Sequence, residues 1–198
     1  MFTTQTTHST LVQKTIGINP GFLTNIMLAI VGSLALWASA KISIPFYPVP
    51  MTMQTFVVLM IGMSCGWRLG GATILLYLAE GAIGLPVFSG TPERGSGLAY
   101  MAGPTGGYLL GFVISAVTVG WLAERGCGRN AFTTLAAMTL GTAVIFAAGL
   151  IWLGSVIGWD KPILALGLTP FIFGAAIKIA LAATAMPFAW KILDRTKE

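Results

Sequence analysis

The stretch LTPFIFGAAIKIALAATAMPFAW, residues 168–190, decides the fold class and the position of the candidate site. It is strongly apolar and carries one charge, Lys178, near its middle. A run of this length and composition is typical of a transmembrane helix, which needs about 20 apolar residues to cross a bilayer. An ammonium group at a helix centre costs roughly 2.5–3.5 kcal/mol on insertion scales, so it usually faces the interior of a bundle.

The helical neighbours of Lys178 support an interior position. An alternative is that the lysine snorkels to the membrane surface along its own aliphatic stem. The next charge, Lys191, lies about 20 Å farther along the helix, which makes snorkelling difficult. Small residues beside a charge allow close helix packing or leave room for a ligand, so we expect Lys178 to face an anionic group. Its neighbours one and two turns away are Phe171, Gly174, Ala182 and Ala185.

The composition indicates an all-α integral membrane protein with a single domain over residues 1–198. Hydrophobic residues make up 56% of the chain and charged residues only 9%, whereas a soluble domain carries about 25% charged residues. We expect a polar N-terminal tail over residues 1–20 and a helical bundle over residues 22–193. The tail lacks the features of a cleaved signal peptide.

The charge pattern and the cysteines exclude several classes of function. The net charge is +5, but the basic residues are scattered at the ends of apolar runs, which argues against nucleic acid as a partner. Cys65 and Cys127 lie far apart in the sequence and His8 sits in the polar tail, so we expect neither a metal site nor a cofactor. No set of residues resembles a catalytic site or an ATPase motif, so we expect a non-enzyme. If the protein moves a solute across the membrane, the energy must come from a partner or an ion gradient.

Six transmembrane helices are expected from the apolar windows. Three prolines, at 45, 48 and 50, interrupt the chain between the first two helices. Arg68 marks a tight turn between the second and third. The segment 84–107 is rich in glycine but also apolar, which favours an ordered loop, such as a lid, over a flexible connector. The expected helices span residues 22–42, 51–67, 68–85, 104–123, 131–153 and 168–190.

The basic residues predict the orientation. Six helices place both termini on one side, and Lys and Arg concentrate on the cytoplasmic side of membrane proteins. We therefore expect both termini in the cytoplasm, the 84–107 loop outside, and a location in the cell (inner) membrane. In this arrangement the inner basic residues are Lys14, Arg68, Arg125, Arg129, Lys191, Arg195 and Lys197, and the outer ones are Lys41, Arg94 and Lys161.

Four polar side chains fall at one depth in the bundle. At 1.5 Å per residue, Lys178, Glu80, Gln54 and Tyr108 lie about 18–24 Å from the inner ends of their helices. A lysine and a glutamate in one apolar layer invite pairing, because an unpaired buried charge is costly. A purely structural ion pair is one interpretation. The preferred one is a ligand site open to the outside, with the lysine for an anionic group.

The first helix offers a surface for a partner. Ala29 with Ser33, and Ala35 with Ser39, form pairs of small residues four positions apart. Such pairs allow a second helix to approach closely. They also serve packing inside a single bundle, and the sequence alone leaves both alternatives open.

Four motifs in order resemble the BioY family, the biotin-specific S components of energy-coupling factor (ECF) transporters. They are AKISIP at 40–45, PVPMTMQT at 48–55, GLPVFSG at 84–90 and GPTGGY at 103–108. The resemblance implies a six-helix S-component bundle in the lipid bilayer that captures biotin from outside with high affinity. It also implies docking, through the first helix, onto a transmembrane coupling subunit that carries two ATPases.

The resemblance completes the list of candidate residues. Lys178 would take the biotin carboxylate, while Phe88 and Tyr108 would flank the fused rings. An aspartate typical of the family is replaced by Ala175, and an arginine of some members by Leu109. Our hypothesis is that Glu80 replaces the aspartate and that Arg94 holds the carboxylate or closes the lid. The expected substrate-binding residues are Lys178, Glu80, Gln54, Arg94, Tyr108, Phe88 and Tyr77.

One alternative function belongs to a different class. The chain could be a stand-alone secondary carrier for biotin or another anionic vitamin, with Lys178 and Glu80 serving a proton-coupled cycle. The sequence has no obvious inverted repeat or paired broken helices, which many secondary carriers possess. The capture subunit is therefore the preferred hypothesis.

Overall fold

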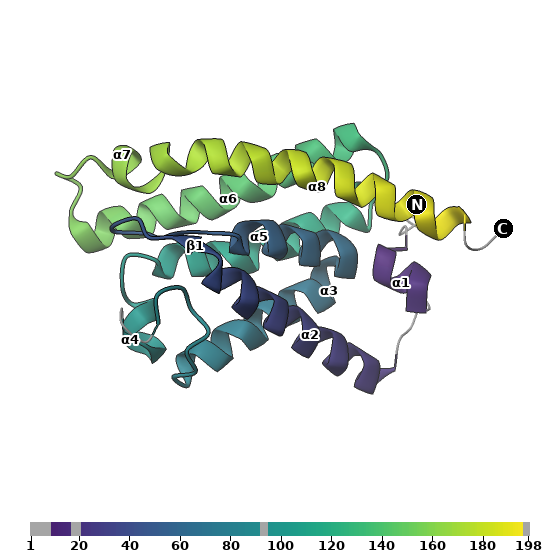
Figure 1. Cartoon of the computed structure of the whole chain (residues 1–198), viewed down its shortest axis with the longest axis horizontal. Helices are drawn as coiled ribbons and strands as arrows, with labels where there is room; N and C mark the ends of the chain where they lie inside the picture. The colour runs from purple at the N-terminus through teal and green to yellow at the C-terminus, as the bar shows by residue number, and fades with distance from the viewer. Residues whose placement is uncertain (1–8, 17–20, 92–94, 196–198) are drawn as a thin grey trace, which may run out of the picture.

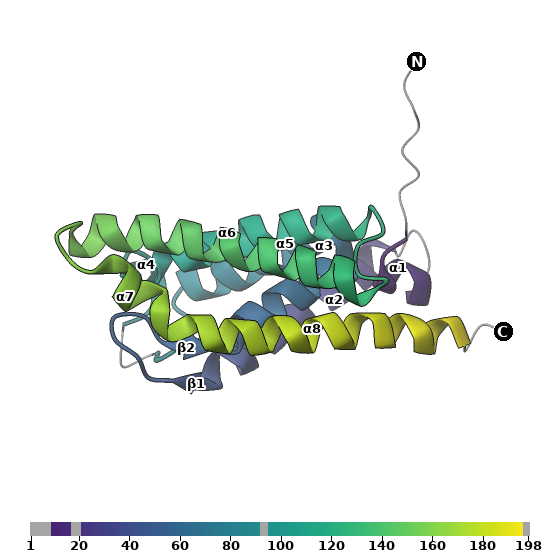
Figure 2. The same cartoon turned by 90° about the horizontal axis from the view of Figure 1, so that it is seen from above.

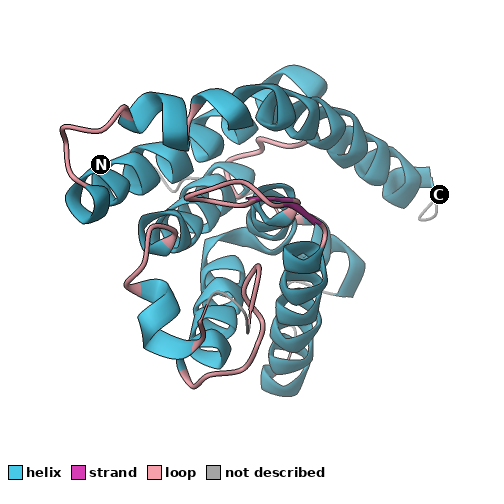
Figure 3. Cartoon of the chain, turned by 60° about the vertical axis from the view of Figure 1, so that its left-hand side comes forward, coloured by secondary structure: helices cyan, strands magenta, loops and turns pink. Residues whose placement is uncertain are grey.

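A computed structural model describes residues 9–16, 21–91 and 95–195 of the chain. Helices dominate these residues, and one two-stranded antiparallel hairpin pairs Ser43 with Thr52 and Ile44 with Met51 (Figures 1 and 3). The elements are α1 (Leu11–Ile16), α2 (Phe22–Lys41), β1 (Ser43–Ile44), β2 (Met51–Thr52), α3 (Gln54–Ala82), α4 (Gly97–Met101), α5 (Gly106–Ala123), α6 (Ala131–Ile157), α7 (Ile163–Gly167) and α8 (Thr169–Arg195).

The long helices run lengthwise through the molecule and leave its irregular segments at the two ends. Helix α8 lies along α6, and α1 sits at the same end as the last turns of α8 (Figures 1 and 2). Helices α4 and α7 lie at the opposite end, toward which the tip of the β1–β2 hairpin also points (Figure 2). Both ends of the described chain are therefore far from the long loop between α3 and α5.

The helices have the length and surface of membrane-spanning segments. Within the described residues, five helical segments are long and apolar enough to cross a bilayer. Their outer faces are apolar too: Phe22 is 81% exposed, Phe132 79% and Phe173 78%. A helix that is hydrophobic all round is typical of a lipid environment. The expectation of a helical integral membrane protein is confirmed at this level, although the β1–β2 hairpin departs from an all-α chain.

Helix α3 folds back on itself at Gly66. The Gln54 side chain donates a hydrogen bond of 2.7 Å to the Tyr77 hydroxyl, although the two residues are 23 positions apart. A straight helix would separate them by about 34 Å. Gly66 has φ 79° and ψ 178°, a conformation that only glycine adopts readily, and it reverses the chain. The turn that the sequence places at Arg68 therefore lies at Gly66, between two arms of α3.

Segments expected to be irregular contain short helices. The 84–107 loop includes α4, and the 1–20 tail includes α1. The loop is packed: the Phe88 ring stacks on Tyr100 at 4.9 Å and forms a T-shaped pair with Tyr77 at 5.6 Å. All three rings are buried. These contacts bind the loop to α3 and form one wall of the site described below.

The reversal at Gly66 makes a prediction about stability. Gly66→Ala forces a side chain into a left-handed conformation and places its Cβ 2.5 Å from the Glu124 Oε1 atom. Strained residues of this kind cost about 1–3 kcal/mol. We expect a clearly lower midpoint of thermal unfolding in detergent. Gly21→Ala is the control, because Gly21 has negative φ and open space around it. Equal midpoints for the two variants would contradict the role assigned to Gly66.

Candidate functional site

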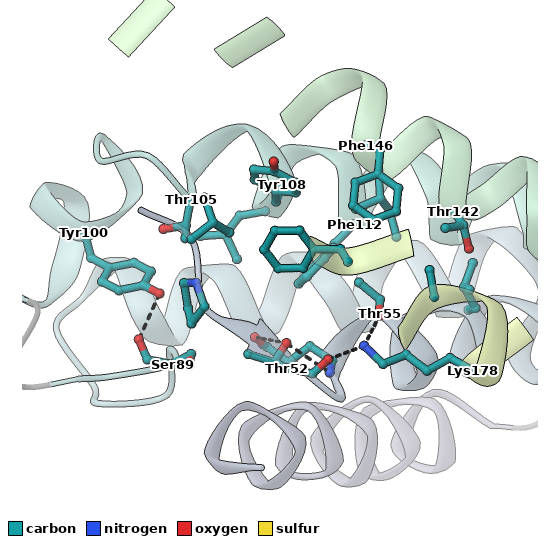
Figure 4. Close-up of a pocket in the computed structure, with 18 residues that line it drawn as sticks. Thr52, Thr55, Ser89, Tyr100, Thr105, Tyr108, Phe112, Thr142, Phe146 and Lys178 are labelled. Carbon is teal, nitrogen blue, oxygen red and sulfur yellow. Dashed lines mark hydrogen bonds between the residues drawn. The ribbon is translucent and has the colours of Figure 1, made fainter. Parts of the chain in front are cut away.

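A pocket lies among α3, α5, α6 and α8 and is bordered by the β1–β2 hairpin and the 85–91 loop (Figure 4). Its empty volume is about 700 Å³, including the part open to solvent. The lining residues are Val49, Pro50, Thr52, Gln54, Thr55, Leu59, Ser89, Tyr100, Thr105, Tyr108, Leu109, Phe112, Thr142, Ile145, Phe146, Phe171, Ala175 and Lys178.

Aromatic side chains form an apolar wall. The Phe146 ring lies 6.4 Å from Tyr108 and 6.2 Å from Phe171. Phe112, at 4% exposure, completes this wall from α5 (Figure 4). Such a wall suits the flat or fused ring system of a small molecule.

Lys178 supplies the positive charge of the pocket. Its Nζ atom donates to the Thr52 carbonyl oxygen at 2.5 Å and to Thr55 Oγ1 at 3.1 Å (Figure 4). No carboxylate lies within 4.0 Å of this ammonium group among the described residues. An ammonium group has three N–H donors, so one remains for a ligand. The pocket therefore offers a half-buried cation to an anionic group.

Gln54 and Tyr77 form a polar chain behind the pocket. Gln54 lines the pocket and donates to the Tyr77 hydroxyl, which in turn donates to the Val87 carbonyl at 2.9 Å. Tyr77 is fully buried and outside the pocket lining. Its position supports Gln54 and the loop rather than a direct contact with a ligand. A second N–H of the Gln54 amide is left for a ligand.

Ser89 and Tyr100 also line the pocket, and neither is among the residues expected from the sequence. The Tyr100 hydroxyl donates to the Ser89 carbonyl at 2.9 Å (Figure 4). Ser89 is 2% exposed, and its Oγ atom has no hydrogen-bond partner within the described residues. Buried hydroxyl groups almost always have a partner. Because Ser89 also lines the pocket, its hydroxyl is a candidate to bind a ligand. The only sequence signal was the position of Ser89 inside the GLPVFSG motif.

The other residues expected to bind the substrate differ in their positions relative to the pocket. Tyr108 lines the pocket with its ring, while its hydroxyl donates to the Gly167 carbonyl at 2.8 Å. Phe88 packs behind Tyr100, outside the lining. Ala175 does line the pocket, so the position where the resemblance implies an aspartate faces the site. Arg94 lies outside the described residues.

Glu80 does not form an ion pair with Lys178. The Ser33 hydroxyl of α2 donates a hydrogen bond to Glu80 Oε2, and the lining of the pocket does not include Glu80. Glu80 lies on the face of α3 that packs against α2. The ion pair with Lys178 that their common depth suggests is therefore not formed. The structure therefore gives no support to the idea that Glu80 replaces the carboxylate absent at Ala175.

Most of the small residues expected to bind a partner face the interior. Ala29, Ser33 and Ser39 are buried, with exposures of 9%, 1% and 4%. Ala35 alone of the four lies on the exposed face of α2. Packing within the bundle, the alternative left open above, accounts for the other three.

Lys41 fastens the 85–91 loop to the end of α2. Its Nζ atom donates to the carbonyls of Pro86 at 2.8 Å, Phe88 at 3.3 Å and Thr91 at 3.4 Å. It also lies 3.4 Å from Thr91 Oγ1. Because the loop carries Ser89, this lysine positions one wall of the pocket.

Comparison with known proteins identifies the family. Residues 4–195 match the sequence model of the BioY family. The chain belongs to the BioY family. The resemblance found in the four sequence motifs is thereby confirmed.

Relatives of this BioY protein are named as biotin transporters. The chain is 39% identical over 168 residues to the biotin transporter BioY of Rhizobium etli, which covers 81% of this chain and 87% of that protein. It is 37% identical over 157 residues to the probable biotin transporter BioY of Pyrococcus horikoshii, covering 79% and 88%.

A crystal structure supports the fold. The chain is similar to the S component for biotin from an ECF-type ABC transporter, with a TM-score of 0.73 and 26% sequence identity. The similarity covers 85% of this chain and 92% of that one. The bundle described above is thus similar to that of a known S component.

The contacts of Lys41 predict the behaviour of the loop. Lys41→Met removes the ammonium group, so we expect backbone amides of residues 85–91 to exchange hydrogen at least several-fold faster. Hydrogen exchange followed by mass spectrometry measures this directly. Lys161→Met is the control, since Lys161 forms its ion pair with exposed Asp160 and, among the described residues, donates no hydrogen bond to this loop. Unchanged exchange in the Lys41 variant would show that other contacts hold the loop.

Proposed function

We propose that this BioY protein is the S component that captures biotin with high affinity and delivers it across the membrane to the cytoplasm. The observation that carries the proposal is the single ammonium group, Lys178, facing an aromatic pocket. Biotin joins a fused bicyclic ring to a carboxylate tail, and the two features match these two parts of the pocket. The names of the relatives and the biotin S component of similar structure support the same substrate.

In the proposed complex each part of biotin meets a distinct set of residues. The remaining N–H of Lys178 binds the carboxylate, and the rings lie against Phe112 and Phe146. The ureido group needs both donors and acceptors, which Gln54 and the Ser89 hydroxyl offer. This arrangement assigns no role in binding to Glu80. It also explains how the site functions with alanine at position 175.

The proposed topology has six spans with both termini in the cytoplasm of an inner-membrane protein. The two arms of α3 count separately, beside α2, α5, α6 and α8. Basic residues support the orientation, since Lys14, Arg129 and Arg195 gather at the end that carries α1. Lys41 and Lys161 lie near the loops of the other end, which would be extracytoplasmic together with the α3–α5 loop.

The proposed partner is an ECF module of a transmembrane coupling subunit and two ATPases. The support is the similarity to the S component of an ECF-type transporter. On this chain, the exposed face of α2 around Ala35 is the part of the predicted docking helix that a partner could reach.

The role of Lys178 is tested by comparing two ligands. Lys178→Met should weaken biotin binding about tenfold or more, because a charge-assisted hydrogen bond is worth about 1.5–3 kcal/mol. Biotinol, which replaces the carboxylate by a hydroxymethyl group, should bind the wild type more weakly than biotin does. The variant should lose this discrimination. Calorimetry measures all four affinities, and Lys161→Met is the control. If the variant still prefers biotin over biotinol by the same factor as the wild type, Lys178 does not bind the carboxylate.

The unpaired hydroxyl of Ser89 gives a second test of the site. Ser89→Ala should weaken biotin binding several-fold without lowering the unfolding midpoint, because the hydroxyl has no partner to lose within the described residues. Ser115→Ala is a matched control: Ser115 is equally buried and unpaired but outside the pocket. Equal biotin affinities for the two variants would exclude the proposed contact.

A further inference from the structure

A second pocket lies at the opposite end of the molecule, beside the last turns of α8. Its lining comes from one face of α8 and from the link between α5 and α6. On α8 the lining positions follow a helical spacing, so they form a continuous stripe. The residues are Arg129, Pro187, Trp190, Lys191, Asp194 and Arg195.

This pocket carries a net positive charge. Three of its side chains are cations, Arg129, Lys191 and Arg195, and all three are exposed. Its one carboxylate, Asp194, already forms an ion pair with Lys14 of α1. In the described part of the chain, no carboxylate lies within 4.0 Å of the three cations. The pocket is therefore suited to an anion.

A buried tryptophan contacts one of these cations. Trp190 is 7% exposed, and its ring faces Lys14 Nζ at 5.6 Å and the Arg129 guanidinium at 4.7 Å. Arg129 also donates to the Ser9 carbonyl at 3.5 Å. These contacts hold Arg129 over the pocket. The arrangement is thus built by three separate parts of the chain.

The pocket lies where the apolar part of α8 ends. Tryptophan, lysine and arginine at the end of a spanning helix typically mark the level of the lipid headgroups. Beside the cations, Phe188 is 65% exposed and Ile192 48% exposed on the same helix. An anion that binds here can therefore place apolar chains against the protein at the same time. A free phosphate ion would use only the cations.

We propose that this pocket binds the phosphate headgroup of an anionic phospholipid. Arg129, Lys191 and Arg195 contact the phosphate, while the acyl chains run along Phe188 and Ile192. Basic pockets between transmembrane helices are a known means of binding such headgroups. A bound lipid would join the end of α8 to the α5–α6 link. The site is independent of the biotin pocket.

The test compares two variants that lose the same charge. Arg129→Gln/Arg195→Gln alters the pocket, while Arg68→Gln/Arg125→Gln removes two arginines that lie over Trp67 and Trp121, outside it. Each protein is purified from mixed micelles of phosphatidylglycerol and phosphatidylcholine, and retained lipid is counted by native mass spectrometry. We expect the wild type and the control to retain phosphatidylglycerol. The pocket variant should retain at least tenfold less, with normal biotin binding as evidence of folding.

Three outcomes would overturn the proposal. Equal loss in both variants would indicate a general effect of surface charge. Equal retention of phosphatidylcholine by the wild type would exclude selection of an anionic headgroup. Complete displacement of phosphatidylglycerol by millimolar inorganic phosphate would assign the pocket to the free anion instead of a lipid.

Discussion

The structure depends on how one ammonium group is accommodated in an apolar bundle. Lys178 is stabilised by the Thr52 carbonyl and the Thr55 hydroxyl, which lie where the β1–β2 hairpin meets α3. The prolines at 45, 48 and 50 prevent a continuous helix between α2 and α3. In a helix the Thr52 carbonyl would accept a hydrogen bond from a backbone amide one turn farther along the chain. Because the chain is not helical at Thr52, this carbonyl is available to Lys178 instead. The proline loop and the lysine of α8 therefore form one unit.

A second constraint places the polar groups opposite Lys178. The reversal at Gly66 returns α3 alongside its own first arm, so that Tyr77 can support Gln54 at the pocket wall. The close approach of the two arms requires small residues: a Cβ atom at Gly70 would lie 3.1 Å from the Gly62 Cα atom of the first arm. The Tyr77 hydroxyl then holds the Val87 carbonyl, and Lys41 holds the neighbouring part of the loop. Backbone geometry in α3 thus determines the position of Ser89 in the pocket.

The sequence predicts how deep in the bundle a residue lies better than it predicts which way its side chain points. Apolar windows place the long helices close to their observed bounds, and the common depth of Lys178, Gln54 and Tyr108 corresponds to a common pocket. Glu80 has the same depth but faces α2, because distance along a helix does not determine which neighbour a residue meets. Ser89 comes from an irregular segment and Tyr100 from the short helix α4, and neither is long enough for a periodicity that indicates which side chains point inward. Their contacts with each other arise because the 84–107 loop folds back on itself.

In the proposed complex, the Lys178 ammonium group binds the ligand carboxylate while it donates hydrogen bonds to Thr52 and Thr55. The most direct measurement is an experimental structure of the protein with biotin bound. It should place a carboxylate oxygen within about 3.2 Å of the Lys178 Nζ atom, with the fused rings against Phe112 and Phe146. A carboxylate bound elsewhere in the pocket, or a Lys178 side chain turned toward lipid, would contradict the account.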